Sequence, residues 1–335
     1  MNIREVAKKA RVSTATVSRT INEPEKVNPR TAERVRKVIE QLNFYPNTHA
    51  RTLVSGRSRI LGLIISDITN PFFPELVKSF EDQAVTHGRE IIIGNTDYDP
   101  KRMAGCIRRM VERKVDGVAI MTSETDPQLL AELARRSIPT VLLDTAPAGP
   151  RSLTLSIDYA QGIHEAVDHL LALNHRRIAF IAGPLHLQSA RARQSAFISR
   201  LQSRGITVEE DLMQTGDHRI EGGTRAMENL LKLKQRPSAV IASNDLTAIG
   251  ALGVIFEAGL RVPDDISLVG FDDISFARLT QPPLTTVRVS RSDLAVTAFT
   301  ALEKLVKNDA DIGDETNRSE LIATHLVERR STRAI

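Results

Sequence analysis

The sequence has a single cysteine, Cys106, and no apolar run long enough to cross a membrane. One cysteine excludes an intramolecular disulfide and a zinc site built from cysteines. The first residues, MNIREVAKK, lack the apolar segment of a signal peptide. No later apolar segment approaches the roughly 18 residues of a membrane span. We therefore expect a cytoplasmic protein, and 335 residues suggest two or three domains.

Signatures of common enzyme classes are also missing. The chain contains no GxxxxGK phosphate loop, no GxGxxG and no GxSxG. His164 and His169 in HEAVDH are five residues apart, which is about 140° around a helix, so they cannot share a zinc ion as an i, i+4 pair does. We expect no catalytic residues, no metal and no cofactor. An α/β sugar-binding or sugar-modifying protein with a non-specific basic N-terminal hairpin stays open as the alternative.

Positive charge is concentrated at the N-terminus. Residues 1–60 carry 13 Lys and Arg against 5 Glu, a net charge of +8. The whole chain carries +4, so the remaining 275 residues carry −4. A basic module on an acidic body is typical of nucleic-acid-binding proteins.

Residues 3–22 predict two short helices joined by a tight turn. The first has an apolar face with a spacing of i, i+3, i+4 and i+7, formed by Ile3, Val6, Ala7 and Ala10. Ser13 is a suitable N-cap for a second helix from Thr14 to about Ile21, with Val17 and Ile21 facing the first. The outward side chains of the second helix are small and polar. This pattern fits a helix-turn-helix that enters a major groove, or else an ordinary helical hairpin with a solvated face.

A third amphipathic helix follows, and Pro46 is expected to end it. Its apolar positions are Val27, Val35, Val38, Ile39 and Leu42. With these three helices, residues 1–59 resemble the DNA-binding head of the LacI/GalR family of bacterial transcription regulators. The matching motif consists of Val12, Ser13, Thr16, Val17, Ser18, Arg19, Asn22, Tyr45, Pro46 and Asn47.

The resemblance implies a helix-turn-helix domain at 1–46 and a hinge helix at 47–59. It implies a repressor that binds a pseudo-palindromic operator in double-stranded DNA as a homodimer. Thr14, Ala15 and Arg19 would face base edges, with Arg19 best suited to guanine. The predicted contacts to phosphates or in the hinge are Ser13, Thr16, Ser18, Asn22, Asn47, Arg51 and Leu53. Leu53 would wedge into the minor groove.

From residue 60 onward, strands alternate with helices. Short apolar runs predict buried parallel strands at 60–66, 90–94, 116–121, 139–143, 177–183, 238–243 and 266–271. Helical patterns lie between them, which indicates a doubly wound α/β fold. The resemblance implies a periplasmic-binding-protein-like core of two Rossmann-like lobes, at 60–335. We place the N-lobe at about 60–159 and 289–318 and the C-lobe at about 160–288 and 319–335, with passages between lobes near 158–161, 286–290 and 317–321.

Polar residues follow several of these strands, where ligands bind in open α/β sheets. Asn70, Asn244 and Asp272 are examples, and each could instead cap a helix or form a turn. Together with Phe72 and Phe73 they favour a cleft for a hydroxyl-rich ligand.

The family resemblance assigns eight effector-binding positions in this chain. They are Asp67, Phe72, Phe73, Ser189, Arg193, His218, Asn244 and Asp272. Leu187 stands where purine-binding members have an arginine, which argues against a purine effector. A sugar or sugar acid is preferred. The short basic C-terminus, THLVERRSTRAI, favours a dimer over a tetramer.

Overall fold

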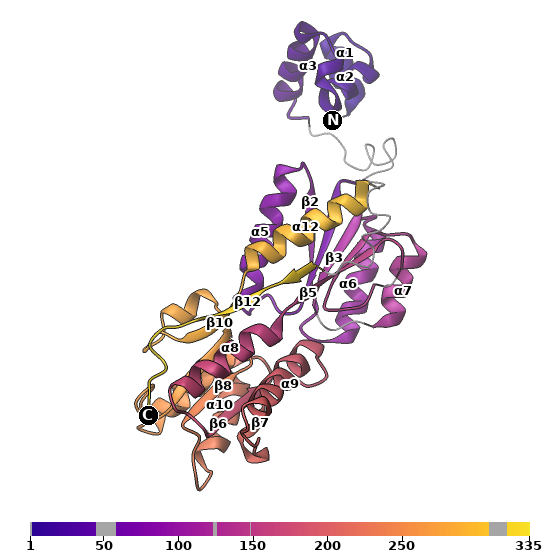
Figure 1. Ribbon diagram of the computed structural model, residues 1–335. Coiled ribbons are helices and arrows are strands. Elements are labelled where there is room, and N and C mark those ends of the chain that lie inside the picture. Colours follow the sequence, from indigo (N-terminus) through magenta and orange to yellow (C-terminus); the bar gives the residue numbers. More distant parts are fainter. Residues whose placement is uncertain (1, 45–57, 123–125, 148, 308–319) are drawn as a thin grey trace. The chain divides into compact units, whose positions relative to one another are not determined.

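The computed structural model describes residues 2–44, 58–122, 126–147, 149–307 and 320–335, without the side chain of Asn22. The chain forms two compact units, a head of Met1–Ser58 and a core of Arg59–Ile335 (Figure 1). Within the described ranges, none of the helices is long and apolar enough to cross a membrane.

Three helices form the head: α1 (Ile3–Ala10), α2 (Thr14–Asn22) and α3 (Pro29–Gln41). A 3-10 turn, η1 (Pro24–Lys26), separates α2 from α3. The buried side chains shared by the helices are Val6, Ala7, Ala10, Val17, Val35, Val38 and Phe44. The predicted packing of the second helix on the first is confirmed. The third helix ends at Gln41, before a left-handed Asn43 with φ of 43°, so Pro46 is not the residue that ends it.

The core contains two six-stranded sheets. The first has the order β11-β5-β4-β3-β1-β2 and all its strands are parallel. Its strands are β1 (Ile60–Ile65), β2 (Glu90–Asn95), β3 (Gly117–Met121), β4 (Thr140–Leu143), β5 (Ser152–Ile157) and β11 (Glu320–Ile322). The second has the order β12-β10-β9-β8-β6-β7 and is parallel except for the pair β10 and β12. Its strands are β6 (Ile178–Ala182), β7 (Met213–Thr215), β8 (Ala239–Ala242), β9 (Ser267–Asp272), β10 (Thr285–Val289) and β12 (Thr324–Val327).

Helices cover both faces of each sheet, and the two sheets with their helices are the two lobes. The N-lobe helices are α5 (Phe72–Thr86), α6 (Pro100–Glu112), α7 (Pro127–Arg135) and α12 (Arg291–Lys307). The C-lobe helices are α8 (Tyr159–Ala172), α9 (Gln188–Ser203), α10 (Ile220–Leu231) and α11 (Asp245–Glu257). Adjacent residues of one strand face different layers: Ile64 packs with α6, whereas Leu63 and Ile65 pack with α5. The predicted doubly wound fold is therefore confirmed.

The chain passes between the lobes three times. Asp158 joins β5 to α8, Ser290 joins β10 to α12, and Ala323 joins β11 to β12. We expected the last passage near 317–321 and the C-lobe from 319. However, Glu320–Ile322 pairs with β5 in the first sheet, so the chain stays in the N-lobe until Ile322.

Candidate DNA-binding helix and ligand cleft

Helix α2 has one buried and one exposed face. Its N-cap Ser13 accepts a hydrogen bond from the amide of Thr16, and the two hydroxyl groups lie 2.9 Å apart. Val17 is fully buried, whereas Thr14, Ala15 and Arg19 are exposed. The small exposed side chains allow close approach to a flat or grooved surface. Figure 1 shows α2 in the head, at the N-terminal end of the chain.

The structure places the predicted DNA-binding residues unevenly. Ser13, Thr14, Ala15 and Arg19 are exposed, and Thr16 and Ser18 are half-buried. The side chain of Asn22 lies outside the described part of the chain, as do Asn47, Arg51 and Leu53.

A cavity of about 60 Å³ lies between the lobes, at the carboxyl ends of the strands. Seven of the eight predicted effector residues line it: Phe72, Phe73, Ser189, Arg193, His218, Asn244 and Asp272. Both lobes contribute, since α5 supplies Phe72 and Phe73, and α9 supplies Ser189 and Arg193. The eighth, Asp67, does not line the cavity. Its carboxylate accepts hydrogen bonds from Thr69 and pairs with Arg219 at 3.3 Å.

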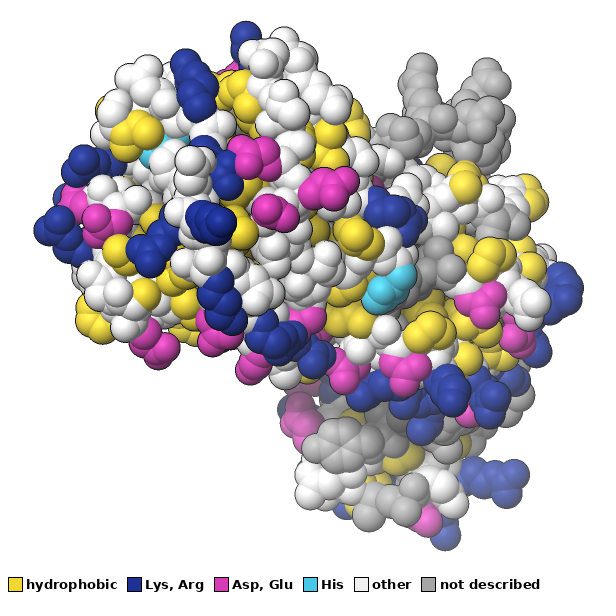
Figure 2. Space-filling model, turned by 90° about the horizontal axis from the view of Figure 1, so that it is seen from below, with side chains coloured by type: hydrophobic (Ala, Val, Ile, Leu, Met, Phe, Trp, Pro, Cys, Tyr) yellow, Lys and Arg dark blue, Asp and Glu magenta, His cyan; other side chains and the backbone are white. Residues whose placement is uncertain are grey.

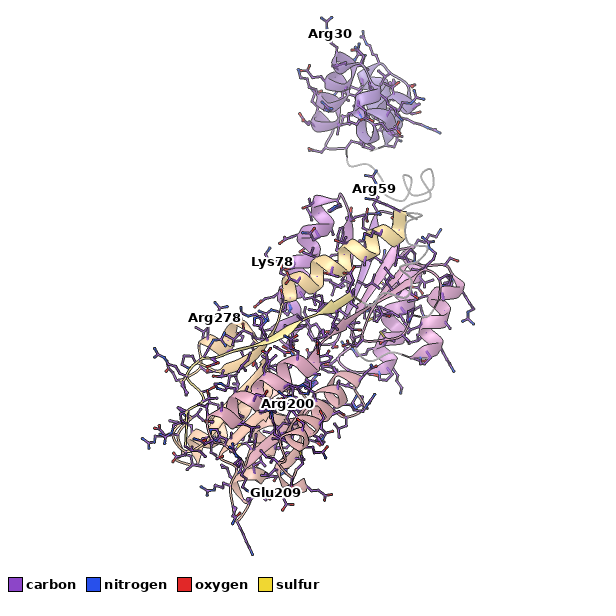
Figure 3. The ribbon with its side chains drawn as sticks, in the orientation of Figure 1. Arg30, Arg59, Lys78, Arg200, Glu209 and Arg278 are labelled. Atoms are coloured by element: carbon purple, nitrogen blue, oxygen red, sulfur yellow. The ribbon has the colours of Figure 1, made fainter. Side chains whose placement is uncertain are left out.

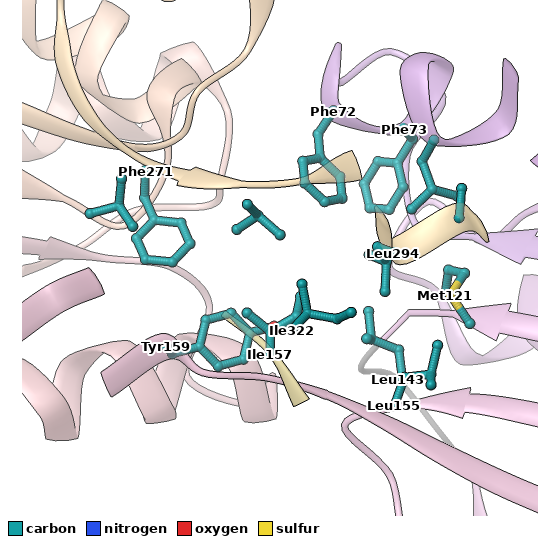
Figure 4. Packing of buried hydrophobic residues seen from close by; sticks show 14 of the residues in the cluster. Phe72, Phe73, Met121, Leu143, Leu155, Ile157, Tyr159, Phe271, Leu294 and Ile322 are labelled. Atoms are coloured by element: carbon teal, nitrogen blue, oxygen red, sulfur yellow. The ribbon is translucent and has the colours of Figure 1, made fainter. Parts of the chain in front are cut away.

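Nine further residues line the cavity, among them Tyr98, Thr122 and Tyr159. Thr122 directly follows β3, so the rule used for the other strand ends could have found it. Tyr159 begins α8 at the passage between lobes, and its hydroxyl group donates to Asp144 at 2.7 Å. The apolar side of the cleft includes Phe72, Phe73, Met121, Leu143, Ile157 and Tyr159 (Figure 4).

Arg193 is the central cation of the cleft. One terminal nitrogen donates to the carbonyl of Ser243 at 2.5 Å, and the other lies 3.8 Å from the Asp272 carboxylate. The guanidinium carbon lies 4.1 Å from the ring centre of Phe271 and 4.8 Å from that of Tyr159. Its Nε is buried without a hydrogen-bond partner among the described residues. This unpaired donor therefore belongs to a side chain that lines the cavity.

Burial shifts two other titratable groups in the cleft. Burial raises the pKa of Asp272 to about 6, and the nearby Arg193 and Arg291 oppose that shift. Burial, then the charges of Arg193 and His186, lower the pKa of His218 to about 3. His218 is therefore neutral near pH 7, and its Nε2 is buried without a partner among the described residues.

Two asparagines line the cavity and also bind backbone amides where helices begin. The side-chain Oδ1 of Asn70 accepts from the amide of Phe72, the first residue of α5. Asn244 accepts from the amide of Thr247 as the N-cap of α11, and its amide group donates to the His218 carbonyl. The capping and cleft interpretations of these residues are thus compatible.

The described residues hold no group of His, Cys, Asp and Glu that could bind a metal ion. On the face of the core seen in Figure 2, acidic and basic side chains are interspersed, whereas residues 1–60 carry a net charge of +8.

Comparison with known proteins identifies both units. Residues 2–47 match the bacterial regulatory proteins of the lacI family, and residues 167–332 match a periplasmic binding protein-like domain. An HTH-type transcriptional repressor PurR from Klebsiella pneumoniae is 35% identical over 331 residues, covering 98% of this chain and 96% of that protein. The chain belongs to the LacI family. Among other relatives of this LacI-family chain, the ribose operon repressor of Escherichia coli is 34% identical over 302 residues, with 90% and 91% coverage.

Solved structures agree with this family assignment. A lac repressor dimer bound to operator and the anti-inducer ONPF is similar to the LacI-family chain with a TM-score of 0.87 and 28% identity, covering 100% of this chain and 99% of that one. A complex of the transcriptional regulator CelR with cellobiose has a TM-score of 0.70 and 27% identity, with 99% coverage of both chains. The LacI-family protein is a sequence-specific DNA-binding transcription regulator under small-molecule control, and not an enzyme.

Proposed function

We propose that this repressor binds a pseudo-palindromic operator as a homodimer in the cytoplasm, and that a sugar or sugar derivative in the cleft controls its affinity for DNA. The observation that carries the proposal is the cleft itself. It combines aromatic side chains with polar groups from both lobes, among them the unpartnered Nε of Arg193 and Nε2 of His218. Aromatic faces and directed polar groups together suit a hydroxylated ring.

The size of the cavity supports control by lobe movement. One water occupies roughly 10–15 Å³ on this measure, so about 60 Å³ holds only a few waters. A monosaccharide must therefore widen the cleft or move its side chains. A ligand that changes the angle between lobes changes the spacing of the two hinge segments in a dimer. The affinities for DNA and effector are then reciprocally coupled.

A sugar is favoured over a purine by the chemistry of α9. Leu187, at its N-terminus, is 1% exposed and offers no hydrogen bond to a ligand. Calorimetric titration of the full chain with D-ribose, D-glucose, D-gluconate, hypoxanthine and guanine tests this. Binding of a sugar or gluconate supports the proposal, whereas binding of only a purine contradicts it.

On the DNA side, we propose that Thr14, Ala15 and Arg19 face base edges. Ser13, Thr16, Ser18, Asn22, Asn47 and Arg51 would contact phosphates or sugars, with Leu53 in the minor groove. The exposure of Arg19 on a helix whose other exposed residues are small supports this assignment.

Arg19→Ala should cost about 1 to 3 kcal/mol of binding free energy at the operator and much less on random DNA. The control is Arg34→Ala, which removes an exposed arginine of α3 with no ion pair to a described residue. Fluorescence anisotropy on operator and scrambled duplexes measures both. Equal losses on the two duplexes would show that Arg19 contacts only phosphate.

The proposed dimer surface lies on the core. Large apolar side chains are exposed there, with Phe256 at 79% and Leu279 at 69%. Leu279→Glu should produce monomers in sedimentation equilibrium at a concentration where the unmodified chain is dimeric. Leu185→Glu, which changes an exposed leucine after β6, is the control.

Selection from sheared genomic DNA tests the whole proposal. Enrichment of a two-fold symmetric site, with half-sites about one helical turn apart, supports it and supplies the operator. Failure to enrich any site, in buffer and in cell-extract metabolites, contradicts it.

A further inference from the structure

Two neighbouring N-lobe helices run from the ligand cleft toward the residue at which the core joins the linker. Helix α5 begins with the cleft residue Phe72, and α12 begins at Arg291. They pack along their length through Phe80 and Phe299, whose ring centres are 5.6 Å apart. Figure 1 shows the two helices side by side. At 1.5 Å per residue, a 17-residue helix such as α12 spans about 25 Å.

At the cleft end, Arg291 ties the two helices to each other and to the opposite lobe. Its Nε donates to the Glu75 carboxylate of α5 at 2.7 Å. A terminal nitrogen donates to the carbonyl of Asp272, a C-lobe residue that lines the cavity, also at 2.7 Å. The guanidinium group also lies 5.9 Å from the ring centre of Phe72. Arg291 therefore contacts cleft residues of both lobes without lining the cavity itself.

At the far end, Arg89 ties the two helices together again. Arg89 follows α5, and its guanidinium donates to both Glu303 carboxylate oxygens of α12, at 3.1 and 3.2 Å. Its third nitrogen donates to Asp116 at 2.6 Å. The side chains of Arg89, Asp116 and Glu303 are only 7%, 7% and 10% exposed. We call these three residues the linker cluster.

The linker cluster also holds the backbone of Arg59. The Asp116 oxygen that binds Arg89 accepts the amide N–H of Arg59 at 3.0 Å. The Arg59 carbonyl accepts from the amide of Glu90 at 2.9 Å, and Arg59 has a left-handed φ of 60°. Arg59 is the first residue of the core, and the chain from there leads back to the head. Figure 3 labels Arg59 near the end of α12.

We propose that α5 and α12, joined at both ends by ion pairs, transmit the state of the cleft to the backbone of Arg59. The inference rests on the proposed function, in which a cleft ligand controls DNA binding. A ligand that displaces Asp272 or Phe72 moves Arg291, and stiff helices carry that movement to Glu303. Glu303, Arg89 and Asp116 then set the position and the order of Arg59, where the linker begins. We call α5, α12 and the ion pairs at their two ends the connector. Arg291 and Glu303 are its positioning residues.

The alternative is that the linker cluster only stabilises the N-lobe. A communication pathway requires evidence of coupling and not merely of contact. The decisive quantity is the protection of the Arg59 amide, because its hydrogen bond to Asp116 reports on the linker end while the substitution is made at the cleft end.

Amide hydrogen exchange of the full chain, followed by mass spectrometry on peptides spanning Arg59, tests the connector without ligand or DNA. Arg291→Met keeps an apolar side chain near Phe72 and removes the bonds to Glu75 and Asp272. It should speed exchange at Arg59 by about tenfold. Glu75→Gln, a milder change at a half-exposed site, should act in the same direction. Glu303→Gln should also speed this exchange, and combining it with Arg291→Met should add little.

The matched control is Arg219→Met. Arg219 pairs across the cleft with Asp67 and Asp97, and among the described residues it has no ion pair with α5 or α12. It should leave exchange at Arg59 unchanged. If Arg291→Met and Glu75→Gln also leave it unchanged while Glu303→Gln accelerates it, the cluster holds the linker end without sensing the cleft, and the proposal is wrong. An equal acceleration by Arg219→Met would point to general loosening between lobes and would also overturn it.

This test is separate from that of the proposed function. The exchange experiment is carried out without DNA. Failure to enrich an operator would therefore contradict the proposed function but not the coupling between the cleft and Arg59. If an operator is found, Arg291→Met and Glu303→Gln should keep its recognition but reduce the fold-change in affinity that a bound effector causes. An unaltered fold-change in both variants would contradict the connector and leave the repressor function intact.

Discussion

Arg89 and Arg193 are both buried in the core, yet their nitrogens are used differently. Their side chains are 7% and 9% exposed. All three nitrogens of Arg89 donate to carboxylates, at 2.6 to 3.2 Å. Arg193 donates to one carbonyl, lies 3.8 Å from its carboxylate and leaves Nε unpaired among the described residues. It stacks on Phe271 and Tyr159 instead.

The difference separates a structural arginine from one available to a ligand. Buried polar atoms in native proteins are nearly always hydrogen-bonded, and an unpaired one costs about 1–3 kcal/mol. Arg193 lines the cavity, and we attribute the unpaired donor there to a site that a ligand occupies. At Arg89 each of the three nitrogens already donates to a carboxylate, so this residue contributes to the fold and to the linker end. The following substitutions test that distinction.

The largest expected effect is on stability at Arg89. Arg89→Met removes the guanidinium partner of two buried carboxylates, while Glu303 keeps Lys307 at 3.3 Å and Asp116 keeps the Arg59 amide. The free energy of unfolding should therefore fall by about 3 kcal/mol, the lower end of the range for breaking a buried pair. Urea denaturation followed by circular dichroism measures it. The control is Arg135→Met, at an exposed arginine without an ion pair to a described residue, which should change stability by less than about 0.5 kcal/mol. Similar losses in the two variants would remove the structural role assigned to Arg89.

The head, the doubly wound core and most of the cleft could be predicted from the sequence, because their signals lie in short stretches of neighbouring residues. Apolar periodicity identifies helices, and polar residues after buried runs identify strand ends such as Asn244 and Asp272. The full set of eight effector candidates came from the family resemblance, and seven of them line the cavity. Five of the described strands were not among the seven predicted runs: β5, β7, β10, β11 and β12. The sequence of β5, SLTLSI, alternates and is half-buried, unlike the continuous apolar runs that were predicted.

The two arginines show why the rest could not be predicted. Arg89 lies 27 residues from Asp116 and 214 residues from Glu303. No spacing rule joins such partners, because only the completed sheet brings the helix ends together. Asp67 gave the same strand-end signal as Asp272, yet it pairs with Arg219, 152 residues later. Whether a strand-end carboxylate faces the cavity is thus decided by tertiary contacts.

The next largest effect is on ligand binding at Arg193. Arg193→Met keeps an apolar contact with Phe271 but removes the donors, so affinity for the sugar found by calorimetry should fall by about 1.5–3 kcal/mol. Stability should fall less than in Arg89→Met, because the Asp272 carboxyl left behind has a pKa of about 6 and can take up a proton. Titration calorimetry and urea denaturation measure the two quantities. If Arg193→Met instead lost as much stability as Arg89→Met while retaining sugar affinity, the roles of the two arginines would be reversed.

The smallest effect is on pH dependence at Asp272, the counterion of Arg193. Burial raises its pKa to about 6 in the folded chain, above the roughly 3.9 of an unfolded Asp. Between pH 7 and pH 5 the folded state therefore takes up a proton that the unfolded state does not bind. This group adds about 1 kcal/mol of stability over that interval as the pH falls. Asp272→Asn should lack that gain, so the difference in unfolding free energy between the two proteins should change by about this amount from pH 7 to pH 5. A constant difference would mean that the carboxyl keeps an ordinary pKa beside Arg193, and that the loose 3.8 Å pair is as well compensated as the tight pairs of Arg89.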